Sequence, residues 1–301
     1  MNIAVTGGAG FIGSHLVDKL VAEGNEVLVI DNLCSGKKEQ VNKKSKFIQK
    51  DIRSDLVSEL QGIDALFHLA ADPEVRTSAE NPKNSFDINV IGTFSILEAC
   101  RKADVKNFIL TSTSTVYGEP SVIPTPEIHH CAPISNYGAS KLACEAYLSS
   151  YASTYGIKGT NLRFANIFGE RSTHGVMFDF FHKLKKSPET LEILGDGKQA
   201  KSYLHISDCI AATLTAWKKQ KIQYDVFNVG SKDKVTVNSL ARLMCEIMEL
   251  EPDFRYTGTK RGWKGDVPVM LLDVNKLEAL GWKQQTPFEE GVQRYIEWLG
   301  K

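Results

Sequence analysis

The sequence has no long apolar run, no closely spaced cysteines and no excess charge of either sign. None of its hydrophobic stretches approaches the roughly 18 residues that are needed to span a bilayer. Met1 to Thr6 already has the pattern of a strand, which leaves no room for a signal peptide. Because 36 basic residues balance 36 acidic ones, nothing favours nucleic acid or an anionic membrane surface as a partner. We therefore expect a soluble, cytoplasmic protein.

Ligand patterns for a metal are missing as well. The six cysteines, at positions 34, 100, 131, 144, 209 and 245, lie far apart and include no Cys-x-x-Cys pair. Four of them have apolar or helical neighbours, as free thiols of a reducing compartment usually do. His129 and His130 form no ligand pattern with another histidine, cysteine or carboxylate. We predict no metal site.

The sequence does contain short β-branched runs that alternate with helical patterns. Strands are predicted at residues 2–6, 27–30, 47–49, 65–69, 108–111, 159–164, 203–205 and 226–229, and helices at 11–23, 84–103 and 136–155. This alternation predicts an α/β fold with a doubly wound parallel sheet that is covered on both faces. After about Phe164 the rhythm breaks into loops and short helices. We predict a dinucleotide-binding domain at 1–165 plus 201–230, whose strands all join the sheet, and a smaller lobe at 166–200 plus 231–301.

Glycines directly follow the first strand, in VTGGAGFIGSH. Gly7, Gly10 and Gly13 precede and begin the first helix, where a tight turn lets the backbone approach a pyrophosphate beside the positive end of that helix. The second strand ends in Asp31, whose carboxylate can accept hydrogen bonds from both hydroxyls of an adenosine ribose and would repel a 2′-phosphate. NAD is therefore favoured over NADP. Asp51 and Ile52 follow the third strand, either near the adenine or as ordinary loop residues.

A tyrosine and a lysine lie four residues apart in SNYGASKLACEA. The spacing places Tyr137 and Lys141 on one face of a helix, where the lysine ammonium is expected to lower the phenol pKa from its usual value of about 10. Tyr137 would then serve as a general base. Tyr256 and Lys260 have the same spacing, but Gly258 lies between them in a turn-like stretch. We interpret that second pair as accidental.

Five hydroxyl residues, Thr111 to Thr115, end the apolar strand in ILTSTSTVYG. They are either a solvated transition from strand to loop or part of the reactive site. In a doubly wound sheet, ligands gather at the carboxyl ends of the strands, where Thr113 and the start of the Tyr137 helix would meet.

These motifs together resemble the extended short-chain dehydrogenase/reductases. TGGAGFIGSHLVDKL, HLAA, TSTSTVYGE, YGASKLACE, RFANIFGERS and GDGKQAKSYLHISD are similar to segments of UDP-glucose 4-epimerases, and the likeness extends to LGW at 280–282. RGWKGDV, from Arg261 to Val267, most resembles the compact archaeal-type members. The resemblance implies a Rossmann-type fold with a nucleotide-sugar lobe, bound NAD as cofactor and a UDP-hexose as substrate.

The resemblance also assigns catalytic roles. Thr113 would hydrogen-bond the 4-hydroxyl of the sugar and relay its proton to Tyr137 as C4 transfers a hydride to NAD. The 4-keto sugar would turn over and receive the hydride on its other face, while Lys141 holds the nicotinamide ribose. Related dehydratases and decarboxylases carry a carboxylate where Ser114 and Thr115 stand, so Thr115 argues against elimination of water.

Further residues are implied as ligands of the cofactor and the substrate. For NAD they are Gly7, Gly10, Phe11, Ile12, Gly13, Asp31, Asn32, Ser35, Gly36, Asp51, Ile52, Leu69, Ala70, Ala71, Asn89, Thr111, Tyr137, Lys141 and Phe164. For the substrate they are Thr113, Asn166, Val176, Lys201, Tyr203, Arg261 and Asp266. Trp263 and Gly175 depart from the pattern of larger epimerases, so Arg261 or Arg76 would have to supply the usual phosphate-binding arginine.

Three functions remain open at this point: a UDP-hexose 4-epimerase, a nucleotide-sugar reductase or dehydratase, and a dinucleotide-binding regulator without activity. The presence of Thr113, Tyr137 and Lys141 together favours the first. In relatives, two long helices from each subunit form a dimer interface. Here they would be 84–103 and 136–155, whose apolar residues could equally be core: Ile88, Ile91, Phe94, Tyr147 and Tyr151.

Overall fold

The computed structural model describes residues 1–258 and 267–301, and a seven-stranded sheet lies at its centre. The strand order is β11-β6-β5-β4-β1-β2-β3, and every neighbouring pair is parallel. The strands are β1 (Asn2–Thr6), β2 (Glu26–Asp31), β3 (Lys46–Gln49), β4 (Ala65–His68), β5 (Asn107–Thr113), β6 (Lys158–Phe164) and β11 (Tyr224–Val229). The order reverses between β1 and β4, which is where such a sheet leaves a crevice at its carboxyl edge. The predicted doubly wound parallel sheet is confirmed.

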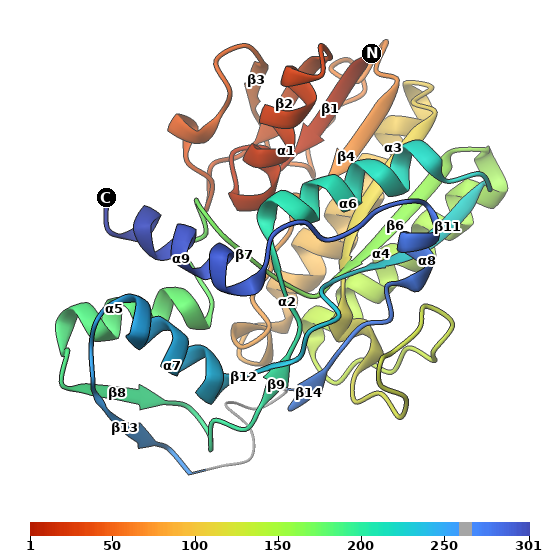
Figure 1. The fold of residues 1–301 in the computed structure, drawn as a ribbon. Coiled ribbons are helices and arrows are strands. Elements are labelled where there is room, and N and C mark those ends of the chain that lie inside the picture. Colours follow the sequence, from red (N-terminus) through yellow and green to blue (C-terminus); the bar gives the residue numbers. More distant parts are fainter. Residues whose placement is uncertain (259–266) are drawn as a thin grey trace.

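Helices cover both faces of this sheet (Figure 1). Leu16 of α1 (Phe11–Ala22) and Trp217 of α6 (Ile206–Lys219) share one buried cluster with residues of the sheet. Leu97 of α3 (Gly92–Lys102) and Leu148 of α4 (Asn136–Tyr155) belong to a second buried cluster. Because the sheet is buried on both sides, the apolar residues of β1, β2 and β4 follow one another instead of alternating with polar ones.

The long helix predicted for residues 84–103 is interrupted. The chain forms a short helix α2 (Pro82–Ser85), then a π-helical segment at Phe86–Ile91, and only then α3. A π-helical turn inside a helix is rare and occurs frequently at functional sites. The prediction of one regular helix was wrong at this point, and Asn89 lies within the irregular segment.

A third buried cluster forms the smaller lobe, in the lower left of Figure 1. Its elements are α5 (Val176–Lys186), β8 (Thr190–Ile193), α7 (Val237–Ile247), β13 (Asp253–Tyr256) and α9 (Phe288–Leu299). Short elements connect it to the main sheet: β7 (Asn166–Phe168), β9 (Ala200–Lys201), β10 (Tyr203–His205), β12 (Val235–Thr236), β14 (Val269–Met270) and α8 (Asn275–Ala279).

Two details differ from the predicted arrangement of the second half. The strand Tyr203–His205 pairs with β7 in a separate two-stranded ribbon instead of returning to the central sheet, whereas β11 does return. Leu272, Leu277 and Trp282 pack in the sheet cluster rather than in the cluster of the lobe. The predicted domain boundaries remain a prediction.

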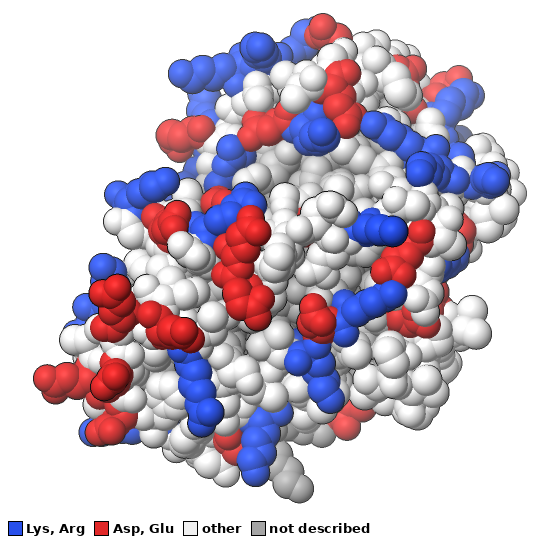
Figure 2. Space-filling model, viewed as in Figure 1, with Lys and Arg blue, Asp and Glu red and all other residues white. Residues whose placement is uncertain are grey.

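The surface carries charges of both signs. On the face drawn in Figure 2, lysine and arginine side chains are interspersed with aspartate and glutamate. No helix in the described part of the chain is long and apolar enough to cross a membrane. Within residues 1–258 and 267–301, no cluster of three or more His, Cys, Asp or Glu side chains could hold a metal ion, and all six cysteines are free thiols.

Candidate functional site

The turn between β1 and α1 is built from glycines that tolerate no side chain. Gly7 has a φ of +71°, and a Cβ on it would lie 2.6 Å from the Ala70 nitrogen. A Cβ on Gly13 would lie 2.1 Å from the Gly7 carbonyl oxygen. Gly10 is the N-cap of α1 and has no side chain to occupy the first N–H groups of that helix. The turn therefore fits a pyrophosphate held by backbone N–H groups, with Phe11 and Ile12 as the first helical residues.

Asp31 connects this turn to the loop after β2. Its Oδ2 accepts a hydrogen bond from the Ala9 nitrogen at 3.0 Å, and its Oδ1 accepts one from the Leu33 nitrogen at 2.8 Å. A carboxylate has about four acceptor positions, so lone pairs remain for ribose hydroxyls. At the other end of this loop, Gly36 packs against Ala9. Asn32 and Ser35 lie in the loop between Asp31 and Gly36, and both are exposed. Asp31 thus fits the adenosine position that the sequence predicted.

Asp51 is already engaged within the chain. The Arg53 guanidinium donates from Nε to Oδ1 and from NH2 to Oδ2, each at 2.8 Å, and the Asn32 amide donates to Oδ2 at 3.1 Å. Arg53 therefore holds the pKa of Asp51 well below its usual value. Arg53 was not among the predicted site residues, although its place two residues after Asp51 could have indicated it. Ile52 is buried against Gly92, and the adenine role of Asp51 and Ile52 stays a prediction.

A buried polar chain lies beneath the carboxyl ends of β1 and β4. His68 Nδ1 lies 2.7 Å from the Thr6 hydroxyl, and its Nε2 lies 3.1 Å from the hydroxyl of Thr93. Burial, with a smaller contribution from the Lys141 charge, lowers the pKa of His68 to about 3, so the ring is neutral. Thr111 donates to the His68 carbonyl oxygen at 3.0 Å. These hydrogen bonds hold the end of β4 in place, directly before the predicted cofactor residues Leu69, Ala70 and Ala71.

Asn89 connects the π-helical segment to α4. Its Oδ1 accepts from the Asp72 nitrogen at 2.8 Å, and its Nδ2 donates to the Asp72 carbonyl at 3.1 Å and to the Ser140 hydroxyl at 2.9 Å. Ser140 in turn donates to the Tyr137 carbonyl at 2.7 Å. Asn89 is therefore tied to the loop after β4 and to the first turn of α4, which gives the predicted cofactor residue a positioning role within the chain.

The three predicted catalytic residues come from β5 and α4. Thr113 ends β5 opposite Phe164 of β6, and its Oγ1 lies 3.1 Å from the hydroxyl and 3.1 Å from the nitrogen of Thr115. Ser135 caps α4 by accepting from the Gly138 nitrogen at 3.0 Å, which fixes where the turn with Tyr137 begins. The Thr113 side chain is close enough to the Tyr137 phenol to lower its pKa, and a Cβ on Gly138, next to Tyr137, would lie 2.8 Å from the Thr115 carbonyl oxygen. The structure thus brings Thr113 and Tyr137 together.

The expected direction of the Tyr137 pKa was wrong for the chain without a cofactor. Burial raises the pKa of Tyr137 to about 12, and the Thr113 side chain lowers it by less than burial raises it. Burial also lowers the pKa of Lys141. Desolvation disfavours whichever form is charged, so it moves an acid and a base in opposite directions. The sequence argument considered the ammonium and left out this opposing effect.

Lys141 and Glu145 lie one turn apart in α4, but their surroundings differ. Lys141 is 3% exposed and makes no hydrogen bond or ion pair with any residue in the described ranges. Glu145 accepts from the Ser112 hydroxyl and is paired with Arg163, whose NH2 lies 2.6 Å from Oε2. Arg163 also donates to the Tyr117 hydroxyl at 2.9 Å. This buried network was missed by the sequence analysis, because nothing local relates residues 145 and 163.

Apart from Thr113, the predicted substrate residues that the structure describes lie on the side of the lobe. Asn166 of β7 and Tyr203 of β10 are paired in register, and Asn166 Nδ2 donates to the Ser202 carbonyl at 3.1 Å. Lys201 precedes them in β9 and is partly buried. Val176 is the first residue of α5, after Gly175 with a φ of +92°. Arg76 is exposed. Arg261, Trp263 and Asp266 lie outside the described residues.

The comparisons with known proteins decide the family. Residues 3–230 match the model of the NAD dependent epimerase/dehydratase family. The chain belongs to this family. The extended short-chain dehydrogenase/reductase resemblance and the prediction of NAD as cofactor are thereby confirmed. The glycine turn and Asp31 are the features of this chain that fit such a cofactor.

Individual relatives are similar over almost their whole length. A putative UDP-glucose 4-epimerase of Methanocaldococcus jannaschii is 38% identical over 99% of this chain and 98% of its own. A crystal structure of a UDP-galactose 4-epimerase is 43% identical, with a TM-score of 0.92 and coverage of 100% of this chain and 99% of that one. The UDP-glucose 4-epimerase of Thermotoga maritima, solved with UDP-glucose, is 38% identical with a TM-score of 0.93 and the same coverage.

Proposed function

We propose that this enzyme interconverts UDP-glucose and UDP-galactose by epimerisation at C4. The observation that carries the proposal is one of placement: Thr113 ends β5 beside the first turns of α4, which contain Tyr137 and the buried Lys141, at the carboxyl edge of a sheet that also carries the glycine turn. The similarity to UDP-glucose 4-epimerases over nearly the full length of both chains supports the choice of substrate.

In this mechanism the protein supplies proton transfer and orientation. Thr113 would bind the 4-hydroxyl and, from its place near Tyr137, would provide a path for the proton. Tyr137 must give up its own proton to act as a base, so the positive charge of Lys141 is needed against the effect of burial. When bound, NAD supplies the acceptor, and afterwards the donor, of the hydride at C4. Asn166 and Lys201 are our candidates for the diphosphate.

Elimination of water is the outcome that the site supports least. Thr115 lies beside Thr113 and provides a hydroxyl where dehydration would need a carboxylic acid. Asp72 and Glu74 raise the pKa of Tyr137. Asp72 is, moreover, held by the Asn84 amide and the Ser85 hydroxyl, each at 3.0 Å. A reductase that uses NADP is disfavoured by Asp31.

The test is an assay of the purified enzyme after release of any bound nucleotide. The enzyme is incubated with UDP-glucose and catalytic NAD⁺, and the products are identified by NMR. We expect UDP-galactose to form without net production of NADH. A 4-keto-6-deoxy product, or no turnover of any UDP-hexose, would overturn the proposal.

We also propose that two copies associate through α3, α4 and the preceding π-helical segment. An apolar strip is exposed there, and it consists of Phe86, Ile91, Phe94, Tyr147 and Tyr155. The rings of Phe94 and Tyr147 lie 5.7 Å apart. Exposed apolar patches of this kind mark interaction sites. Tyr151, which was predicted for the same interface, is 6% exposed and belongs to the core, where its hydroxyl donates to Glu98 at 2.6 Å.

Sedimentation analysis tests this dimer. Phe94→Glu should convert it to a monomer, whereas Tyr256→Glu, at a similarly exposed aromatic residue in β13 of the lobe, should not. An unaltered chain that sediments as a monomer at micromolar concentration would contradict the proposal.

The six free thiols further support a reducing compartment such as the cytoplasm.

A further inference from the structure

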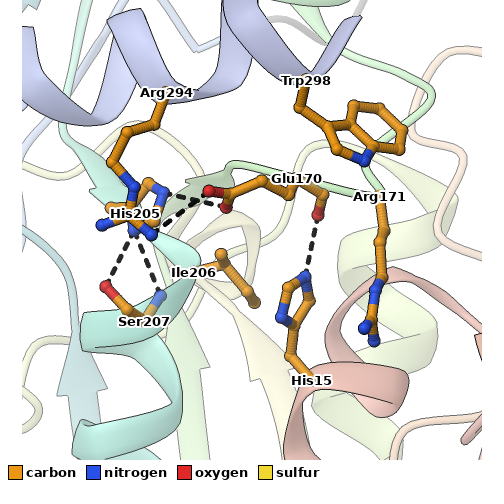
Figure 3. A pocket seen from close by; sticks show the side chains of 8 residues that line it. All are labelled: His15, Glu170, Arg171, His205, Ile206, Ser207, Arg294 and Trp298. Atoms are coloured by element: carbon orange, nitrogen blue, oxygen red, sulfur yellow. Dashed lines mark hydrogen bonds and ion pairs between the residues drawn. The ribbon is translucent and has the colours of Figure 1, made fainter. Parts of the chain in front are cut away.

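A charged cavity lies between α1, the loop after β7, the start of α6 and α9. Its volume is about 310 Å³, and its walls are formed by His15, Glu170, Arg171, His205, Ile206, Ser207, Arg294 and Trp298 (Figure 3). None of these residues belongs to the predicted binding or catalytic set. The cavity is therefore lined by a cluster of titratable side chains that the proposed mechanism does not use.

Glu170 is the centre of this cluster, as Figure 3 shows. Its Oε1 lies 3.2 Å from the Arg294 NH2 group of α9, and its Oε2 lies 3.2 Å from His205 Nε2 at the end of β10. Its carbonyl oxygen lies 2.9 Å from Nε2 of His15 in α1. His205 and, to a smaller extent, Arg294 hold the pKa of Glu170 at about 2, so the carboxylate is charged at neutral pH.

The two residues after Glu170 also connect α1 with α9. Arg171 NH2 lies 2.7 Å from Oδ2 of Asp18, one turn beyond His15 in α1. The Tyr295 hydroxyl of α9 donates to the Ser172 carbonyl at 2.8 Å. Residues 170–172 thus join two elements that are otherwise far apart in the sequence: the helix that begins at the phosphate-binding turn, and the last helix of the lobe.

The β7–β10 ribbon connects this junction to the substrate side. Asn166 and Tyr203 are paired at one end of the ribbon, and Phe168 and His205 at the other. Helix α9 packs closely on the second end, since a Cβ on Gly291 would lie 2.9 Å from the Phe168 ring. Because the ribbon is only three residues long, its orientation at the junction sets the position of Asn166 and Tyr203.

We propose that Glu170 is a positioning residue, which fixes the lobe and the β7–β10 ribbon against the cofactor-binding helix α1 and so sets the affinity for the nucleotide sugar. This inference rests on the proposed function. Glu170 contacts neither predicted binding site and acts through Arg294 and His205. The carboxylate itself lies between the Arg294 guanidinium and His205 Nε2, so the cavity needs no bound anion to complete it.

The experiment compares steady-state kinetics of Glu170→Gln with the unaltered enzyme. We expect KM for UDP-glucose to rise about fivefold, the size of one partly exposed charge-assisted hydrogen bond, while kcat and the NAD content change less than about twofold. Glu278→Gln is the matched control, because Glu278 forms an exposed ion pair with Lys232 at 2.6 Å that does not involve α1. An unchanged KM, or an equal rise in the control, would overturn the proposal.

A double-mutant cycle separates this result from a failure of the proposed function. Arg294→Met should raise KM as Glu170→Gln does, and the double substitution should be no worse than Glu170→Gln alone, because both substitutions remove the contact between these two residues. If the unaltered enzyme does not turn over UDP-glucose, the proposed function fails. The same cycle measured by chemical denaturation then still tests the junction, and additive losses would refute a coupling between Glu170 and Arg294.

Discussion

Helix α4 contains two buried charges one turn apart, and they are treated in opposite ways. Lys141 makes no ion pair with a described residue, whereas Glu145 is paired with Arg163 and accepts a hydrogen bond from Ser112. A buried charge without a partner lowers the stability of the fold. A buried ion pair lowers it strongly only when one of its two partners is removed. The amino-terminal half of α4 therefore accepts a cost where chemistry is expected, and the next turn is satisfied within the protein.

The largest effect should come from the reactive half. Tyr137→Phe removes the proton acceptor but keeps the aromatic ring, so turnover of UDP-glucose should fall about 10²- to 10⁴-fold while NAD stays bound. Activity is measured by NMR and bound nucleotide by release from the purified protein. Near-normal turnover would refute the role of the phenol.

Glu145→Gln tests the satisfied half. The substitution leaves the Arg163 guanidinium buried without a counter-charge, and both side chains are nearly inaccessible, at 4% and 7% exposed. The free energy of unfolding should fall by about 3–5 kcal/mol. Chemical denaturation measures this, with Lys106→Met as the control because its ion pair with Asp104 is exposed. Equal stabilities of the two variants would contradict the contrast between the halves.

Lys141→Met should act with the opposite sign on stability. Because burial lowers the pKa of Lys141, the folded chain binds fewer protons than the unfolded chain just below pH 10.5, so stability rises with pH there. The variant should lose that rise and should be no less stable than the unaltered protein at pH 7.

The activity of Lys141→Met should begin at higher pH, because the phenol has lost the nearby positive charge. An unchanged pH–rate profile would count against the tuning of Tyr137.

The smallest effect concerns the far end of α4. Tyr151→Phe removes one hydrogen bond to Glu98, which keeps its contacts with Arg101. Stability should fall by about 1 kcal/mol, and the sedimentation of the protein should not change. A dissociated dimer would assign Tyr151 to the interface, one of the two places that the sequence analysis left open for it.

Much of the central sheet could be predicted because several of its strands contain local apolar runs, such as Val27 to Ile30 in β2. The bounds of α4 were predicted as observed, since Ser135 caps its start and Gly156 follows its end. The glycine turn and Asp31 were found for the same reason, because their spacing alone places them together. Thr113 and Tyr137 required one further rule, namely that ligands gather at the carboxyl edge of such a sheet.

What the sequence did not predict depends on contacts between distant segments. The π-helical segment places Asn89 on Ser140 of another helix, which no helical periodicity encodes. The pairing of Arg163 with Glu145 and of Glu170 with Arg294 joins residues that no local pattern relates. The pKa of Tyr137 depends on its burial, which only the packed structure reveals.

One comparison tests the contrast within α4 most directly: Lys141→Met and Glu145→Gln, measured side by side for unfolding free energy at pH 7 and for turnover of UDP-glucose. We predict that Lys141→Met keeps its stability and loses activity at neutral pH, while Glu145→Gln loses stability. If both variants lose stability alike, or if Lys141→Met keeps full activity, the division of α4 into a reactive and a structural half is wrong.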